Sequence, residues 1–432
     1  MTLRVPTLVV ETREIEEVDD LLAYASPSVP LAWLRRGEGI VGVGEPVRSL
    51  SVGGENPSGQ ASIPDHATWW RSLTATADVH DDLRLPGTGL VAFGAFAFDR
   101  RSAASSTLVV PPLVIGRRAG RSWVTRIRLA DAGDGAESGA DVDGDLAPQP
   151  YGPYWSATLG PGSLDPAGYQ AAVRTALDAI AAGEIGKVVL ARDVVGTIPW
   201  GSDLRRLVRA LSTGYPDTWT FAVDGLIGAS PETLVTVSGG AVTARVLAGT
   251  IPRGADADDD AEASRDLAAS AKNLDEHRYA VQSVLETLAP HTGTLRADAD
   301  PFTLELPNLW HLATDIAGEI ADHASALDLV AALHPTAAVA GTPTDAAIEV
   351  IRRIEPFDRG RYAGPVGWVD ANGDGEWAIA LRCAQSGPAP AEDPGTVPVG
   401  AHAGAGIVDG SEPESELLET RVKFRPIVDA LA

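Results

Sequence analysis

Lysine is the scarcest charged residue of this sequence, and its positions are the first places where chemistry is expected. Lysine and arginine together number 34 in the 432-residue chain, and the lysines are Lys187, Lys272 and Lys423. Lys187 begins the alternating run Lys-Val-Val-Leu-Ala-Arg, which is typical of a strand. An inward-facing lysine there loses solvation, which favours the neutral amine of a general base. The alternative is a lysine at a strand end whose ammonium reaches solvent.

Glutamates are the second set of candidates. Glu232 closes the small-residue turn Gly-Ala-Ser-Pro-Glu, which can present a carboxyl group to a cleft, although most turn glutamates are simply exposed. Glu416, Glu419 and Lys423 fall at positions i, i+3 and i+7 of a predicted helix and share one face. That face suits a hard cation and an anionic substrate, or else a surface ion network. Glu276 projects away from the apolar stripe of its predicted helix, so periodicity places it in solvent.

Two glycine-containing segments could bring backbone N–H groups close to a ligand. They are Ala248-Gly249-Thr250 and Ala403-Gly404-Ala405-Gly406, and neither has the spacing of a nucleotide-phosphate loop or a dinucleotide fingerprint. His311 and His334 are of a kind that is ordinarily hydrogen-bonded in a core. Because Cys383 is the only cysteine, the sequence excludes an internal disulfide and a cysteine-based metal site.

Short strands and a few well-marked helices must position these residues. Asp165 and Pro166 predict the start of a helix that Gly183 ends, and Ser411 with Glu414 forms a capping-box pattern at the start of the last helix. The other predicted elements are strands at 89–98, 123–129, 187–195, 364–369 and 376–382, a hairpin over 234–246 that turns at 239–240, a solvated loop at 131–145, and one long helix over 261–288.

The formal net charge of −25 is spread along the chain. It excludes general binding of nucleic acid, which needs a basic face. We interpret it as adaptation to high salt, which screens repulsion among surface carboxylates. The alternative is an acidic protein at ordinary salt, which full activity in dilute buffer would favour. The sequence also lacks the pattern of a signal peptide and the roughly 18-residue apolar run of a membrane span, so we expect a cytoplasmic protein with no membrane contact.

Eight ordered segments resemble the motifs of the chorismate-binding enzyme family. Their order and spacing match over roughly residues 165–423, and together they are far more specific than any one motif. The N-terminal part matches only loosely, around residues 94–99. The segments are Lys187–Arg192, Gly228–Glu232, Leu247–Arg253, Ser270–His277, Leu309–Thr314, Gly375–Ala384, Ala403–Ile407 and Glu416–Lys423.

The resemblance implies an α+β fold in which two large antiparallel β-sheets pack as a sandwich with helices outside. It assigns residues 151–432 to the catalytic domain and residues 1–150 to an N-terminal annex of the same fold. It also implies roles for two residues. Lys187 matches the lysine that activates water for attack at C2 of chorismate, and Glu232 matches the acid that protonates the departing C4 hydroxyl.

The resemblance further implies a Mg²⁺ site and contacts for the substrate. Glu276 and Glu419 match the two carboxylates that hold Mg²⁺, and Glu416 would support them through water. Arg382 matches a cation that pairs with the side-chain carboxylate of chorismate. The ring carboxylate is expected near Lys423, and the remaining substrate-binding positions are Ala248, Gly249, Thr250, His311 and Gly404.

Within the family, two features favour the isochorismate synthases, which serve menaquinone or siderophore synthesis. Ala248 stands where aminodeoxychorismate synthases with a covalent mechanism have lysine, and Trp-His-Leu-Ala-Thr at 310–314 is typical of isochorismate synthases. Ala337 and Val339 depart from the common pattern, which puts product specificity in doubt. The alternatives are a salicylate synthase, an anthranilate synthase component I, and a chorismate-binding protein without turnover. No obligatory protein partner is expected for the leading interpretation.

Overall fold

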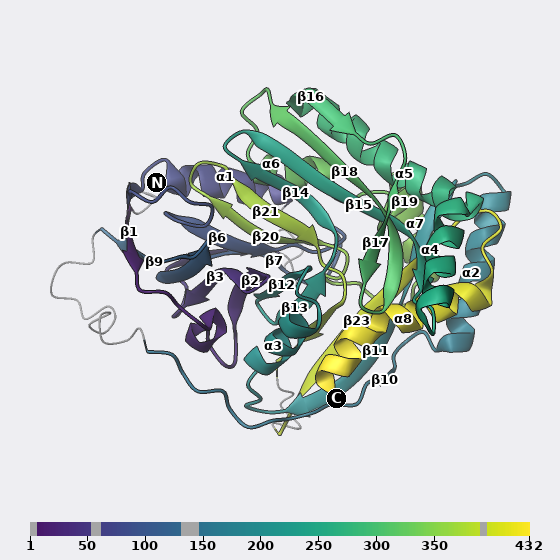
Figure 1. Cartoon of the computed structure of the whole chain (residues 1–432), viewed down its shortest axis with the longest axis horizontal. Coiled ribbons are helices and arrows are strands. Elements are labelled where there is room, and N and C mark those ends of the chain that lie inside the picture. The colour runs from purple at the N-terminus through teal and green to yellow at the C-terminus, as the bar shows by residue number, and fades with distance from the viewer. Residues whose placement is uncertain (1–6, 53–61, 131–146, 389–394) are drawn as a thin grey trace.

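A computed structural model describes residues 7–52, 62–130, 147–388 and 395–432, and two large β-sheets form its body (Figure 1). Neighbouring strands are antiparallel except for the parallel pair β1 and β5. In spatial order the first sheet contains β10 (Gly160–Pro161), β11 (Lys187–Pro199), β23 (Thr396–Ile407), β22 (Cys383–Ser386), β13 (Leu226–Ser230), β12 (Trp219–Val223), β2 (Leu31–Arg35), β3 (Glu38–Val43), β8 (Leu113–Arg118), β9 (Arg121–Leu129), β1 (Leu8–Ile15) and β5 (Asp78–Asp81). The short strand β19 (Gly341–Thr342) pairs with β11.

The second sheet carries the other wall of the sandwich. Its strands, in spatial order, are β16 (Thr292–Ala297), β18 (Leu309–Ile320), β15 (Ala241–Pro252), β14 (Thr233–Ser238), β21 (Gly375–Ile379), β20 (Pro365–Asp370), β6 (Val91–Ala95), β7 (Ser106–Val110) and β4 (Arg48–Val52), with β17 (Phe302–Leu306) paired to β18. This arrangement confirms the predicted fold class of two large sheets with helices outside.

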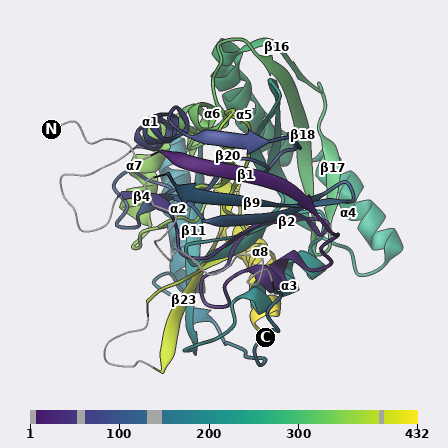
Figure 2. The same cartoon turned by 90° about the vertical axis from the view of Figure 1, so that its left-hand side faces the viewer.

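Helices cover the outside of the sandwich, and several gather at the end where β11 and β23 lie (Figure 1). Figure 2 shows β1 and β9 side by side, away from β11 and β23. The helices are α1 (Ile63–Thr74), α2 (Pro166–Ala181), α3 (Arg205–Gly214), α4 (Ala257–Ala269), α5 (Ala271–Leu288), α6 (Ala326–Leu333), α7 (Thr344–Ile354) and α8 (Pro413–Leu431), with 3₁₀ turns η1 (Leu21–Tyr24) and η2 (Ala289–His291).

Large aromatic side chains fill the space between the sheets. Trp33 of the first sheet and Trp368 of the second are fully buried, and both indole N–H groups donate to the same oxygen of Glu376, at 2.9 and 3.1 Å. Arg118 pairs with the other Glu376 oxygen at 2.9 Å. A buried carboxylate therefore links the two sheets without being left unpaired.

The locally encoded elements agree with the sequence. Asp165 accepts a hydrogen bond from Gly168 N at 2.7 Å and caps α2, whose end is followed by Gly183 at a φ of 76°. The predicted strand at 187–195 is the buried part of β11, and the predicted hairpin is β14 and β15, which turn at Gly239-Gly240. The predicted loop at 131–145 lies outside the described residues.

The prediction of one long helix over 261–288 is wrong. The segment forms α4 and α5, which are separated at Ser270. Ser270 has an extended backbone (φ −74°, ψ 111°), and its hydroxyl accepts from Asn273 N, so a new helix starts there. A serine that caps a helix competes with continuation of the preceding one, and this overrides the helical periodicity across the break.

The predicted capping box at the start of α8 is also wrong. Glu412 occupies the N-cap position and its side chain makes no capping bond. Ser411 is buried instead; its hydroxyl accepts from Val408 N and also contacts the carboxyl group of Glu416. The sequence has the capping pattern, but the Ser411 hydroxyl makes its hydrogen bonds in the interior and does not cap α8.

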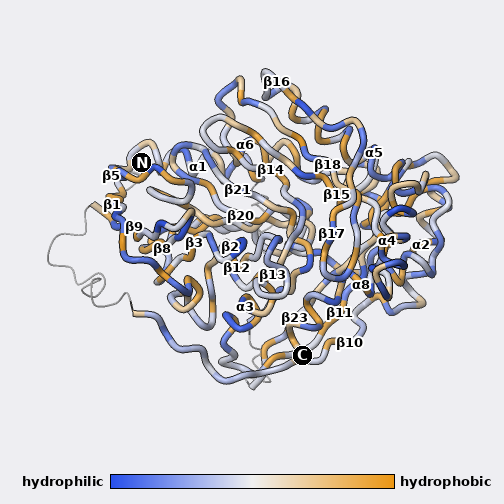
Figure 3. The backbone as a smooth tube through the Cα atoms, in the orientation of Figure 1, coloured by the Kyte–Doolittle hydropathy of each residue, from blue (hydrophilic) through white to orange (hydrophobic). Residues whose placement is uncertain are grey.

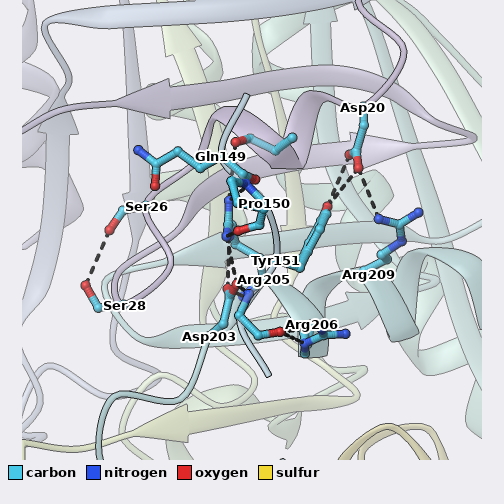
Figure 4. A network of polar contacts seen from close by, with 12 residues as sticks. Asp20, Ser26, Ser28, Gln149, Pro150, Tyr151, Asp203, Arg205, Arg206 and Arg209 are labelled. Atoms are coloured by element: carbon cyan, nitrogen blue, oxygen red, sulfur yellow. Dashed lines mark hydrogen bonds and ion pairs between the residues drawn. The ribbon is translucent and has the colours of Figure 1, made fainter. Parts of the chain in front are cut away.

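An arginine-rich network fastens the segment that connects the N-terminal strands to α2 (Figure 4). Tyr151 donates to Asp20, which also pairs with Arg209 of α3. Arg205 makes a bidentate ion pair with Asp203 and donates to backbone carbonyls of the connecting segment. In each sheet the strands from before residue 150 form one contiguous block and those from after it another, and the blocks join at β12–β2 and at β20–β6. Both sheets therefore continue across this boundary, and the division into two domains at residue 150 stays a prediction.

None of the helices in the described ranges is both long and apolar enough to cross a membrane. In Figure 3 the hydrophobic stretches along the chain are short, and polar residues interrupt them.

Candidate active site

Strand β11 places Lys187 in the interior at the end of the first sheet. Its side chain is 0 % exposed, which contradicts the alternative of an ammonium that reaches solvent. Nζ lies 3.3 Å from Glu276 Oε1, yet among the described residues it has no partner with hydrogen-bond geometry. A buried cation with one loosely placed counter-ion is a costly arrangement, which points to a chemical role rather than a structural one.

Glu232 follows β13 and is 4 % exposed, which contradicts the alternative of a turn glutamate that is simply exposed. One carboxyl oxygen accepts a hydrogen bond from Leu247 N at 3.4 Å. Burial raises the pKa of Glu232 to about 7, although Leu247 N, Lys187, Lys423 and Arg382 each act to lower it. Glu232 therefore carries a proton over much of the neutral range and can deliver it to a substrate.

The hydrogen-bonding register of β15 shifts between Leu247 and Thr250, and this bulge shapes one wall of the site. Gly249 lies inside the bulge with a φ of 83°, a conformation that favours glycine. The bulge leaves Ala248 O free to bond the ring of His277 on α5 at 3.1 Å, and the other ring nitrogen contacts Thr314 Oγ1 at 2.8 Å. His277 thus fixes α5 against β15 and β18.

Glu276 is buried, with 9 % of its surface exposed, so the prediction from periodicity is wrong. The buried face of α5 runs through Glu276, His277, Ala280 and Val284. Leu274 belongs to the predicted apolar stripe, yet it is only half-buried at the edge of that face. Apolar periodicity missed the orientation because the residues of α5 that meet β15 and the site are partly polar.

His311 and Arg382 form a second buried pair. Arg382 Nη2 donates to His311 Nε2 at 3.1 Å, so this imidazole nitrogen must be the acceptor and Nδ1 carries the proton. Nδ1 then faces Thr250 Oγ1 at 3.1 Å and Gly249 O at 3.3 Å. Burial and the nearby Arg382 hold the pKa of His311 well below its ordinary value, which keeps the ring neutral.

Helix α8 brings Glu416, Glu419 and Lys423 to the same site. Lys423 Nζ lies 2.6 Å from Glu419 Oε1 and donates to Gly404 O at 2.9 Å. Glu416 is almost fully buried and accepts from Lys272 Nζ at 2.5 Å. Burial raises the pKa of Glu416 to about 7, and the neighbouring Glu419 adds to this shift. The alternative of a surface network is contradicted by this burial.

A small enclosed cavity joins most of these residues. Nine predicted site residues line it: Glu232, Ala248, Gly249, Thr250, Glu276, His311, Arg382, Gly404 and Lys423. Lys187 lies directly behind Glu276, while Glu416 and Glu419 stand beside the cavity on α8. A larger cavity of about 890 Å³ adjoins it and shares Arg359 and Tyr362 with it. Its buried cations, Arg359 and Arg361, are already paired with Glu355 and Asp224. The smaller cavity, which nine of the predicted site residues line, is therefore the candidate active site.

Several lining residues were not found from the sequence. Tyr362 borders the cavity from the turn before β20, and burial raises its pKa to about 12. Its position between Gly360 and Gly364, directly before a buried strand, was the available signal. Lys272 was noticed only as one of the three lysines, although it precedes Glu276 by one helical turn. Gly406 was part of a motif, and a Cβ there would overlap Glu276 Oε1.

The carboxylates fit a Mg²⁺ site that is completed by water and substrate. Among the described residues no group of three His, Cys, Asp or Glu side chains could hold a metal by itself. Mg²⁺ commonly takes one or two carboxylates together with water and substrate oxygens. The ammonium of Lys272 feels the attraction of Glu416, Glu419 and Glu276, which together raise its pKa against the effect of burial. The carboxylates of Glu276, Glu416 and Glu419 thus favour a cation beside them, and their oxygens are donors of the kind that Mg²⁺ takes.

The cavity is lined from both β-sheets and contains buried carboxyl groups beside the cations Arg382 and Lys423, an arrangement of acids and bases that is typical of an enzyme. Residues 5–432 match the family described as chorismate binding enzyme, and the chain belongs to this family. It is 41% identical over 279 residues to isochorismate synthase DhbC of Bacillus subtilis, covering 62% of this chain and 68% of that protein. It is 37% identical over 359 residues to the putative isochorismate synthase MenF of Mycobacterium tuberculosis, covering 80% and 87%.

Solved structures show the same fold. The putative 2,3-dihydroxybenzoate-specific isochorismate synthase DhbC of Bacillus anthracis matches with a TM-score of 0.74 and 29% identity, covering 95% of this chain and 98% of that chain. The menaquinone-specific isochorismate synthase MenF of Escherichia coli matches with a TM-score of 0.77 and 24% identity, covering 99% and 95%. At that identity the second likeness concerns the fold alone.

Proposed function

We propose that the protein is an isochorismate synthase, which converts chorismate to isochorismate with Mg²⁺. The observation that carries the proposal is the pair of Lys187 and Glu232. Both are buried: Glu232 lines the smaller cavity, and Lys187 lies behind Glu276, which lines the same cavity. The pKa of Glu232 is raised to about 7, chiefly by burial. The names of the relatives described above support the choice of reaction.

The proposed reaction needs one base and one acid on the same substrate. Lys187 takes a proton from water as the water oxygen bonds to C2 of chorismate, and the ring double bonds shift. The C4–oxygen bond breaks, and Glu232 gives its proton to the departing hydroxyl, which leaves as water. While its ammonium is paired with the Glu276 carboxylate, Lys187 cannot accept a proton and is a poor base. The proposal therefore requires Glu276 to engage another cation during turnover.

The cations at the cavity suit the two carboxylates of chorismate. Arg382 is held by His311 and presents a planar donor group for the side-chain carboxylate. Lys423 is held by Glu419 and Gly404 O on the other side, where it can contact the ring carboxylate. Mg²⁺, when bound by Glu276 and Glu419, supplies further positive charge for the ring carboxylate.

Product analysis tests the proposal. The purified protein is incubated with chorismate, with and without Mg²⁺ and ammonia, at low and high salt, and the products are separated by chromatography. We expect isochorismate beside remaining chorismate, and loss of product when EDTA removes the metal. Salicylate or anthranilate as the product would replace this proposal by one of the alternatives. Binding of chorismate without any product would make the protein a chorismate-binding protein.

A further inference from the structure

The ion pair between Lys272 and Glu416 connects α5 and α8, the two helices that carry the proposed Mg²⁺ carboxylates. Lys272 is on α5, four residues before Glu276, and Glu416 is on α8, three residues before Glu419. Residues at these spacings share a helix face. The ion pair therefore stands about one helical turn from the pair Glu276 and Glu419, on the same two faces.

This ion pair is also the hydrogen-bonded link between the two helices. Lys272 Nζ donates to Glu416 Oε1 at 2.5 Å, and both helices lie wholly within the described residues, where no other hydrogen bond or ion pair joins α5 to α8. The side chain of Glu416 is 1 % exposed and that of Lys272 is 30 % exposed. A charge-assisted bond with one end buried has a more defined geometry than an exposed ion pair.

The position of Glu276 depends on α5, and that of Glu419 depends on α8. Glu276, Glu416 and Glu419 all act on the charge of Lys272, and carboxylates in one neighbourhood repel one another. An ammonium between the helices opposes this repulsion and keeps the two faces at a fixed distance before any metal arrives. Residues that orient metal ligands in this way typically change metal affinity by about 10–100-fold when they are replaced.

We propose that Lys272, through its bond to Glu416, is a positioning residue that sets the distance between Glu276 and Glu419 and thereby the affinity for Mg²⁺. This inference rests on the proposed function, because it assumes that Glu276 and Glu419 hold the metal. It gives the third lysine a role distinct from that of the proposed base Lys187 and of Lys423 at the cavity.

The test replaces both partners, so that the net charge is unchanged. In the double variant Lys272→Met with Glu416→Gln, Mg²⁺ binding to the substrate-free protein is measured by titration calorimetry. We expect affinity to fall at least ~10-fold. The apparent Mg²⁺ constant in turnover should rise by a similar factor. The matched control is Asp275→Asn with Arg278→Met, an exposed pair on the same helix, which should bind Mg²⁺ like the wild type.

The single variant Lys272→Met gives an independent result if the double variant does not fold. Removal of one positive charge should by itself attract Mg²⁺ more strongly, so a weaker affinity can arise only from lost positioning. Wild-type or tighter affinity in either variant would overturn the inference while leaving the proposed function intact. A wild-type protein that binds no Mg²⁺, with or without chorismate, would instead overturn the metal role in the proposed function and this inference with it.

Discussion

Two buried cations of the molecule, Lys187 in the candidate active site and Arg205 in the connecting segment, are equally hidden but differently satisfied. Arg205 makes hydrogen bonds to both oxygens of Asp203 and to the carbonyls of Ala23, Gln149 and Pro150 (Figure 4). Among the residues that the structure describes, Lys187 has only the carboxylate of Glu276 near its ammonium, at 3.3 Å. Arginine presents five donors in a planar fork, whereas lysine is a compact point charge, so the first suits a structural clamp and the second suits chemistry.

The ion pairs of the candidate site and those of the connecting segment also differ in the cation that they use. The lysines at 187, 272 and 423 each pair with a different glutamate of the site, at positions 276, 416 and 419. The network of the connecting segment uses arginine throughout, with Asp20, Tyr151 and Asp203 as partners. Burial alone therefore does not distinguish Lys187 from Arg205, whereas the hydrogen bonds of the two side chains do.

The largest effect on turnover is expected for Lys187→Met. The change keeps the length and burial of the side chain and removes the amine, so the proposed base is lost and kcat should fall roughly 10³-fold. The melting temperature should also fall, because the change leaves the buried Glu276 carboxylate without its counter-ion. Initial rates and melting curves measure both, and near-normal turnover would contradict the base role.

Glu232→Gln should have the next largest effect, a loss of about 10²-fold. Burial raises the pKa of Glu232 to about 7, so its acid form is present below that pH and disappears above it. In the wild type kcat/KM should therefore decline as pH rises through about 7, and the residual activity of the variant should lack this decline. The pH profiles of both proteins decide the matter; an unchanged decline in the variant would assign it to another group.

Gly406→Ala should lower turnover about 10-fold and raise the Mg²⁺ concentration that gives half-maximal activity. A Cβ at residue 406 would overlap Glu276 Oε1 and approach Lys187 Cε at 3.2 Å, so the carboxylate has to move. Gly400→Ala on the same strand is the control, since its Cβ would meet only Val194 O at 3.9 Å. Equal Mg²⁺ titrations in the two variants would show that the position of Glu276 does not matter.

The sequence predicted the parts of this comparison that depend on local signals. Asp165 and Pro166 predicted the start of α2, and alternation predicted the buried strand that carries Lys187. The resemblance to the family named Glu276 as a site residue, whereas the apolar stripe of its helix placed it in solvent. Glu276 is buried because α5 packs against β15 and β18. The spacing of apolar residues within α5 alone does not reveal this packing.

Long-range pairing also explains what the sequence did not reveal. Ser411 matched a capping pattern, but the fold turns it toward Glu416 and Val408 N. The link from Lys272 to Glu416 joins residues 144 positions apart, and neither helix alone predicts it. The arginine network was not predicted either, because its acceptors include backbone carbonyls that only the folded connecting segment brings together.

Asp203→Asn should have the smallest effect on turnover and a large one on stability. The change removes the charge that faces buried Arg205, and breaking a buried pair from one side costs about 3–5 kcal/mol. We expect the free energy of unfolding in urea to fall by that amount while kcat stays within about 2-fold. Asp217→Asn is the matched control, because its pair with Arg36 is exposed and such pairs contribute about 0–1 kcal/mol. If Asp203→Asn instead reduced kcat while leaving unfolding unchanged, the assignment of Arg205 to a structural role would be wrong.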